Sequence, residues 1–126
     1  MLSLPCVVRI YLHVQPVNLH LGFDRLANLV REDMGQDPLG GHLFVFRNRR
    51  GDRVKLLFWD DDGYAILYKR LEAGVFRFPQ TDHGVTSLQV KVSDLSLLLW
   101  GIDATTARRQ KRFSLESHRA VHAVAS

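Results

Sequence analysis

Apolar and polar residues alternate at the start of the chain and then change to a helical spacing. From residue 8 to residue 14 every second position is apolar, which predicts a strand with Tyr11 and His13 on a face exposed to water. Between residues 22 and 34 the apolar positions recur every three or four residues, and Gly35 follows them. This spacing predicts a helix with a glycine at its C-terminal end.

Three runs of β-forming residues follow the helix. They cover residues 43–49, 53–59 and 64–71, and turn-forming residues separate them. This order predicts an antiparallel meander, in which each strand pairs with the one before it. Two further strands are expected, a short one at 75–78 that ends before a proline and an edge strand at 85–90.

A second helix is expected where the patterned region ends. Ser93 can cap its first turn. Its apolar face would contain Leu95, Leu98, Leu99 and Ile102. The expected fold class is therefore α+β, with a single domain at 1–103 in which an antiparallel β-meander packs against two helices. A flexible basic tail is expected at 104–126.

Composition narrows the class of protein. The 126 residues are 46% apolar and include one cysteine, Cys6, which rules out an intrachain disulfide framework or a zinc site built from cysteines. The first fourteen residues do not read as a signal peptide, and no apolar run is long enough for a membrane span. We expect a cytoplasmic protein that needs no cofactor.

The basic residues are concentrated in two places. Five arginines and lysines against one glutamate in residues 108–126 account for the net charge of +4, so any basic surface on the body must come from local clustering. One such cluster lies between the first two strands of the meander. Its members are Arg47, Arg49, Arg50, Arg53 and Lys55.

Two pairing registers are possible for this basic hairpin. A two-residue turn at Arg50–Gly51 would place Arg47 opposite Val54, which mixes basic and apolar side chains on both faces. A three-residue loop at 50–52 would instead separate the two kinds of residue, and we choose this register. One face would then carry Arg47, Arg49, Arg53 and Lys55, and the other Phe44, Phe46, Val54, Leu56 and Phe58.

The chosen register sets Arg49 directly opposite Arg53. Like charges across a strand pair are unfavourable, so an anionic partner such as nucleic-acid phosphate would compensate them. The alternative is that arginines at an exposed hairpin tip serve solubility and discourage pairing of strand edges. The tail segment 108–113 could add a second, sequence-independent phosphate contact, or carry its charge without a function.

Enzymatic sites find little support in the sequence. Asp60, Asp61 and Asp62 are consecutive, whereas a two-metal nuclease brings carboxylates together from separate elements, so these residues are expected to form a turn. His118 and His122 have helical spacing but no third ligand nearby. No metal site is predicted.

The central block of the chain resembles a known family. The run from Gly41 to Asp60, continued by Tyr68 to Glu72, Gly74 and Pro79, is similar to the accessory protein called TnpB, the second open reading frame of the insertion-sequence-sixty-six group of bacterial transposable elements. The resemblance extends from about residue 8 to residue 103. Family members usually carry a Thr-Asp-Met-Arg-Lys-like sequence before Gly-Phe-Asp, where this chain reads Val-Asn-Leu-His-Leu at 17–21.

The resemblance implies a small non-enzymatic protein that is encoded beside the transposase and supports transposition. Combined with the charge pattern, it suggests transposon DNA and the transposase as partners, with DNA held by the basic hairpin and two residues of the next strand. The residues expected to contact nucleic acid are Arg47, Arg49, Arg50, Arg53, Lys55, Lys69 and Arg70. The alternative is an adaptor that docks on the transposase through the aromatic residues Trp59, Tyr68 and Phe78.

Overall fold

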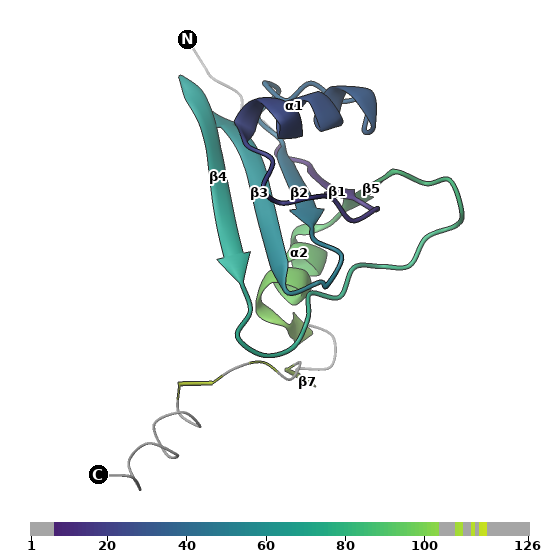
Figure 1. The fold of residues 1–126 in the computed structure, drawn as a ribbon, viewed down its shortest axis with the longest axis vertical. Coiled ribbons are helices and arrows are strands. Elements are labelled where there is room, and N and C mark those ends of the chain that lie inside the picture. Colours follow the sequence, from purple (N-terminus) through teal and green to yellow (C-terminus); the bar gives the residue numbers. More distant parts are fainter. Residues whose placement is uncertain (1–6, 104–107, 110–111, 113, 116–126) are drawn as a thin grey trace, which may run out of the picture.

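The computed structural model describes residues 7–103, 108–109, 112 and 114–115, and these contain one main sheet and two helices (Figure 1). The five strands of the sheet are β1 (Ile10–His13), β2 (Leu43–Arg47), β3 (Arg53–Asp60), β4 (Gly63–Arg70) and β5 (Ser87–Val90). Their order across the sheet is β4-β3-β2-β1-β5. The helices are α1 (Phe23–Glu32) and α2 (Val92–Trp100), and a small ladder joins β6 (Ile102–Asp103) to β7 (Arg108–Arg109).

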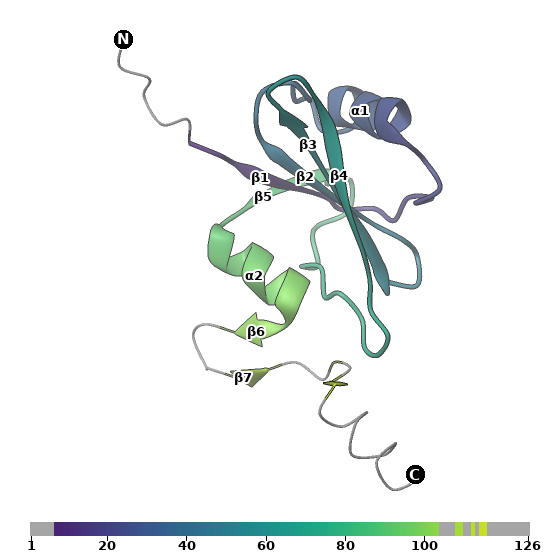
Figure 2. The ribbon, with the colours of Figure 1, turned by 90° about the vertical axis from the view of Figure 1, so that its left-hand side faces the viewer.

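The sheet is mostly antiparallel. The pairs β2–β3 and β3–β4 form the expected meander, and β5 pairs antiparallel with β1 at the edge of the sheet. β1 and β2 run parallel, because α1 carries the chain back to the start of the sheet between them. Figure 2 shows α1 and α2 on opposite faces of the sheet.

Each face of the sheet has its own hydrophobic core. On one face α1 packs with Leu26 and Val30 against Phe44, Phe46 and Leu57 of the sheet. On the other face α2 covers a second cluster, whose members include Ile10, Leu12, Val45, Val54 and Leu56. A sheet that is covered on both faces needs apolar residues at consecutive positions of its central strands.

Because helices cover both faces of the sheet, one expectation for β1, that one of its faces is exposed to water, was wrong. Tyr11 and His13 are buried, with 6% and 3% of their surface exposed, although the alternating pattern predicted that they face water. The prediction was wrong because β1 lies between β2 and β5 and α1 covers the face that carries Tyr11. Alternation alone does not show what covers the second face of a strand.

Two other local predictions were also wrong. Residues 75–78 form no strand, and Phe76 is buried in the core under α2 while its N–H donates a 2.7 Å hydrogen bond to the Gly51 carbonyl. The second helix begins at Val92 after Lys91, whose N–H donates to the Asp94 carboxylate, so Ser93 lies inside the helix and does not cap it.

The register of the basic hairpin is the one that we did not choose. Arg47 lies opposite Val54, and Phe46 lies opposite Lys55. Phe46 therefore faces α1, whereas Val54 faces α2, and the basic side chains are divided between the two faces. The chosen register assumed one polar face, but both faces carry a core, so mixing basic and apolar residues near the strand ends is the favourable arrangement.

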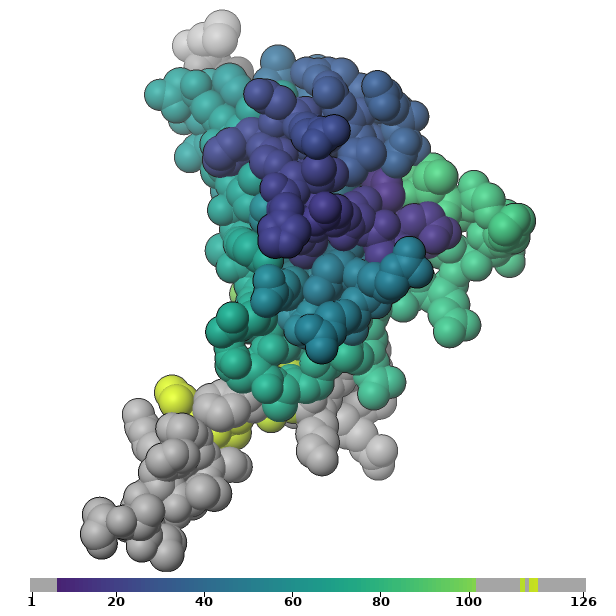
Figure 3. Space-filling view, viewed as in Figure 1, coloured from purple at the N-terminus to yellow at the C-terminus, as the bar shows by residue number. Residues whose placement is uncertain are grey.

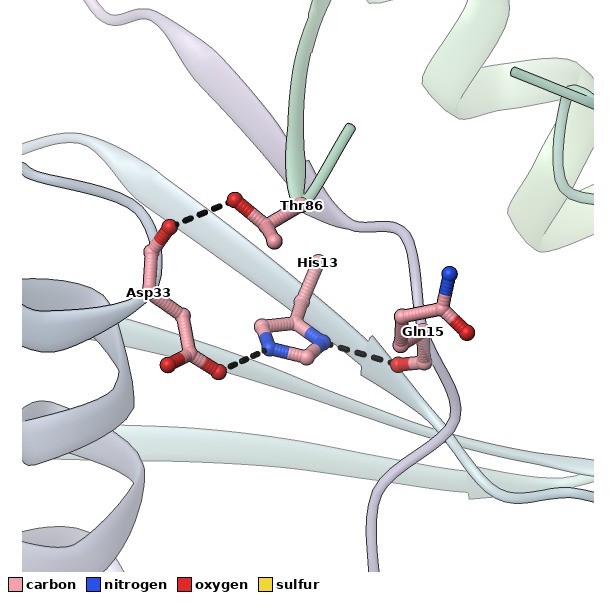
Figure 4. A network of polar contacts seen from close by, with 4 residues as sticks. All are labelled: His13, Gln15, Asp33 and Thr86. Carbon is pink, nitrogen blue, oxygen red and sulfur yellow. Dashed lines mark hydrogen bonds and ion pairs between the residues drawn. The ribbon is translucent and has the colours of Figure 1, made fainter. Parts of the chain in front are cut away.

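A polar network ties α1 to the sheet (Figure 4). The His13 ring contacts the Asp33 carboxylate through Nε2 and the Gln15 carbonyl through Nδ1, both at 2.8 Å. Thr86, before β5, donates a 2.7 Å hydrogen bond to the Asp33 carbonyl. The network thus joins the end of β1, the end of α1 and the start of β5.

None of the helices in the described part of the chain has the length and apolar character needed to cross a membrane.

Candidate nucleic-acid interface

A hollow of about 520 Å³ lies at the carboxyl ends of the parallel strands β1 and β2. One wall is the segment 16–20, which follows β1, and the other is the β2–β3 loop with Arg53 and Tyr68. In Figure 3 these two segments, dark purple and blue-teal, meet on the side that faces the viewer. Ligand sites in α/β sheets form preferentially at the carboxyl ends of parallel strands, because the loops there diverge.

Asn48 organises the loop that forms the second wall. Its side-chain oxygen accepts hydrogen bonds from the N–H groups of Gly51 and Arg53, at 3.0 and 3.1 Å. Its amide nitrogen donates a 2.7 Å hydrogen bond to the Asp52 carboxylate. Gly51 has a φ of +77°, a backbone conformation that favours glycine. One side chain therefore fixes the path of the whole loop.

The hydrogen bond from Asn48 lowers the pKa of Asp52, and the nearby Arg50 and Arg53 lower it further. A carboxyl group with a lowered pKa stabilises the folded loop at neutral pH, and that contribution is lost as the pH falls through the pKa of the folded state. In an NMR titration, we expect the Asp52 carboxyl to titrate below the usual aspartate range, and Asn48→Ala to move its pKa up towards that range. Asn28→Ala, at an exposed amide of α1, serves as the control. An unchanged Asp52 pKa in Asn48→Ala would contradict the assigned cause.

Arg47 and Lys55 hold the first wall in place. The Arg47 guanidinium donates to the Val14 carbonyl at 2.9 Å and lies 4.9 Å from the Phe78 ring centre, and burial lowers its pKa. The Arg47 carbonyl in turn accepts a 2.8 Å hydrogen bond from the Val17 N–H. Lys55 donates to the Leu21 carbonyl at 2.9 Å. These two predicted contact residues thus fix the segment after β1.

Three predicted contact residues line the hollow together. Arg49 and Arg50 are exposed and make no hydrogen bond or ion pair with another described residue. Arg53 donates a 3.3 Å hydrogen bond to the Tyr68 hydroxyl, which raises the pKa of the guanidinium. Because nothing in the described part of the chain neutralises Arg49, its charge is available to an anion.

A smaller hollow adjoins the first one across Tyr68. Its lining residues are Arg53, Tyr68, Arg70 and Glu72, and Arg70 pairs with Glu72 at 2.9 Å. Both members of this pair are more than half exposed, so the pair is weak and Arg70 can exchange its partner for a phosphate. The two hollows together bring four arginines to one surface.

Lys69 lies on the opposite face of the sheet. Its ammonium group donates a 2.6 Å hydrogen bond to the Leu99 carbonyl at the end of α2 and lies over the Trp100 ring. Burial and the neighbouring Arg112 lower the pKa of Lys69. Lys69 therefore caps α2 and lines neither hollow.

The basic tail is only partly within the described residues. Arg112 donates to the carbonyls of Leu98 and Leu99, at 2.9 and 3.1 Å, and lies 5.1 Å from the centre of the Phe76 ring. The backbone of Arg108 and Arg109 forms β7. The other tail positions proposed for phosphate contact, 110–111 and 113, lie outside the described residues, as does most of the tail predicted at 104–126.

The structure adds residues that the charge pattern did not select. Asn18 and His20 are exposed and line the hollow opposite the arginines. The sequence singles out residues 17–21, because they differ from the sequence usual in the family that the chain resembles. It does not predict that this segment lies opposite the basic hairpin. Segments thirty residues apart in the sequence meet here only because β1 and β2 are parallel neighbours.

The three consecutive aspartates form the expected turn. Asp60 pairs with Gly63 at the end of the β3–β4 ladder, which leaves Asp61 and Asp62 as the turn residues. In the described part of the chain, no three His, Cys, Asp or Glu side chains lie close enough together to hold a metal ion.

Fold and surface together define a small α+β protein in which a concave surface of the described part is lined by arginines and suited to anions. The sequence model of the family described as "IS66 Orf2 like protein" matches residues 8–109, which is most of the chain. The protein belongs to this family of insertion-sequence accessory proteins and has a transposition-associated role.

Two relatives come from Sinorhizobium fredii (strain NBRC 101917 / NGR234). The uncharacterized protein y4jC is 37% identical over 103 residues, which cover 82% of this chain and 86% of the relative. The uncharacterized protein y4hO is 36% identical over 96 residues, which cover 76% and 82%. No solved structure matches the chain.

Proposed function

We propose that the protein is a non-enzymatic accessory factor that binds DNA of its insertion sequence through the hollow and assists the transposase. The observation that carries this proposal is the convergence of Arg49, Arg50 and Arg53 on one concave surface. Guanidinium groups bind phosphate through paired, charge-assisted hydrogen bonds. Such contacts position a protein on DNA without reading its sequence.

The proposed contact set is smaller than the one expected from the sequence. Arg49, Arg50, Arg53 and Arg70 face the two hollows, so these four residues would contact phosphates. Arg47 and Lys55 would act indirectly, because they hold the segment that forms the opposite wall. Lys69 has no part in the proposed interface, since it caps α2 on the other face.

The test is a fluorescence-anisotropy titration of a blunt DNA duplex that carries the terminal repeat of the element, at two salt concentrations. We expect Arg49→Glu/Arg50→Glu to bind about 10- to 100-fold more weakly than wild type. The slope of log affinity against log salt should fall by about 0.9 for each phosphate contact that is lost. Both residues are exposed and unpaired among the described residues, so the fold should be unaffected.

The matched control is Arg9→Glu/Arg31→Glu, which changes the net charge by the same amount. Arg9 and Arg31 are exposed and do not line the hollow. We expect this control to stay within about threefold of wild type, because distant surface charges are screened by salt. Equal weakening of both double variants would contradict a specific site, and absence of binding by the wild type would reject the DNA proposal.

A second candidate function is an adaptor that docks on the transposase. Strand β4 is a free edge of the described sheet and exposes Leu67 and Tyr68, which are 47% and 49% exposed. An edge strand with exposed apolar side chains can pair with a strand of a partner. Trp59 and Phe78 support this candidate less, since both are half-buried, Trp59 against Tyr64 and Phe78 beneath Arg47.

A further inference from the structure

The hollow combines two kinds of surface. Arg49, Arg50 and Arg53 supply positive charge, whereas Pro16, Val17 and the Tyr68 ring supply apolar and aromatic area. A surface that contacts only the phosphates of an intact duplex does not need apolar and aromatic area. An unpaired nucleotide can contact both kinds of surface, because its base has an apolar face and its phosphate is negatively charged.

Tyr68 is placed to take part in such a contact. The ring is 49% exposed and lines both hollows, and it lies on β4 two residues before Arg70, which pairs with Arg53 across the ladder. Its hydroxyl accepts a hydrogen bond from Arg53, and the Lys55 ammonium lies 4.9 Å from the ring centre. These contacts fix the ring and bring cations to it, which reduces the conformational entropy lost on stacking.

The remaining lining residues suit the edge of a base. Asn18 and His20 carry hydrogen-bonding groups and stand on the wall opposite the arginines. The volume of about 520 Å³ is within the range of pockets that enclose small organic ligands. Charge, aromatic surface and polar groups thus surround one cavity.

We propose that the hollow between residues 16–20 and the β2–β3 loop is a binding site for an unpaired nucleotide of DNA. The phosphate lies on Arg49, Arg50 and Arg53, and the base lies against Tyr68. This inference rests on the proposed DNA-binding function and adds the class of DNA to it. Because the pocket takes one nucleotide with an unstacked base, it favours single-stranded or distorted DNA over an intact duplex.

The experiment compares labelled oligothymidine with a blunt duplex of the same length in anisotropy titrations of the full chain. We expect wild type to bind oligothymidine more tightly than the duplex. Tyr68→Ala should weaken oligothymidine binding about tenfold, which is typical of one lost base–aromatic stack, and duplex binding less than twofold. Tyr68→Phe keeps the ring and should retain oligothymidine affinity within about threefold.

Leu67→Ala is the control, because Leu67 is equally exposed on the other face of the same strand. It should leave both affinities unchanged. The nucleotide site is rejected, and the proposed function kept, if duplex binding depends on Arg49 and Arg50 but Tyr68→Ala weakens both DNAs equally or neither. Both proposals fail if wild type binds neither DNA.

Discussion

Asn48→Ala is expected to lower the free energy of unfolding by about 2–3 kcal/mol. The substitution removes three hydrogen bonds, two accepted from backbone N–H groups and one donated to Asp52. Each such bond contributes about 1 kcal/mol net, and more where a donor is left buried without a partner. Gly51, which supplies one of these N–H groups, is buried, and after the substitution its N–H keeps only the longer hydrogen bond of 3.2 Å to the backbone carbonyl of residue 48.

The loop conformation should change together with stability. Gly51 and Asp52 also accept hydrogen bonds from Phe76 and Leu71, both at 2.7 Å, so a displaced loop loosens the chain after β4 as well. We therefore expect Asn48→Ala to weaken DNA binding too, although Asn48 carries no charge. Urea unfolding gives the stability change, and anisotropy gives the affinity.

Asn28→Ala is the matched control for this substitution. Asn28 is exposed on α1, where its side chain accepts one hydrogen bond from Arg31. Loss of a single exposed hydrogen bond should change stability by less than about 0.5 kcal/mol. If the two alanine variants were equally stable, Asn48 would not organise the loop.

His13→Leu is expected to cost about 3 kcal/mol of unfolding free energy. The ring is buried and reaches two acceptors, the Asp33 carboxylate and the Gln15 carbonyl. The two ring nitrogens lie at hydrogen-bonding distance from these acceptors, 2.8 Å in each case. Leucine fills a similar volume but leaves both acceptors without their donor, and a lost hydrogen bond to a charged group costs about 1.5–3 kcal/mol.

Two comparisons separate the contributions at this network. His83→Leu makes the same change at an exposed histidine and should alter stability by less than about 0.5 kcal/mol. Asp33→Asn keeps an oxygen acceptor and removes the charge. We therefore expect it to lower the free energy of unfolding by an amount between the effects of His13→Leu and His83→Leu. Urea unfolding with an unchanged m-value is the measurement. Stability of His13→Leu equal to wild type would show that the network gives no net stabilisation.

The local predictions that succeeded rest on turns and short-range spacing. The meander was predicted because Gly51 and the aspartates at 60–62 mark its two turns, and Gly51 does adopt positive φ. Helix α1 was predicted because its apolar positions follow one stripe. Such signals depend on residues that are close in sequence, so they predict local structure without knowledge of the tertiary fold.

The predictions that failed concern what packs against a residue. Tyr11, His13 and the register of the basic hairpin were assigned on the assumption of one polar sheet face. The Asn48 side chain and the two cores stabilise the register in which Arg47 lies opposite Val54. The residue types near the turn do not predict this register. Arg47, Lys55 and Lys69 were chosen for their charge, but carbonyl acceptors from distant segments engage all three.

By itself the sequence determined the class of fold, the positions of most strands and helices, the basic hairpin and the family. Only the tertiary structure decided which arginines share a surface and what stands opposite them. The reason is that the hollow forms between a segment after β1 and a loop after β2, and these become neighbours through the parallel pairing of the two strands. Charged residues can be counted along a sequence, whereas the direction of each charged side chain and its partners depend on long-range packing.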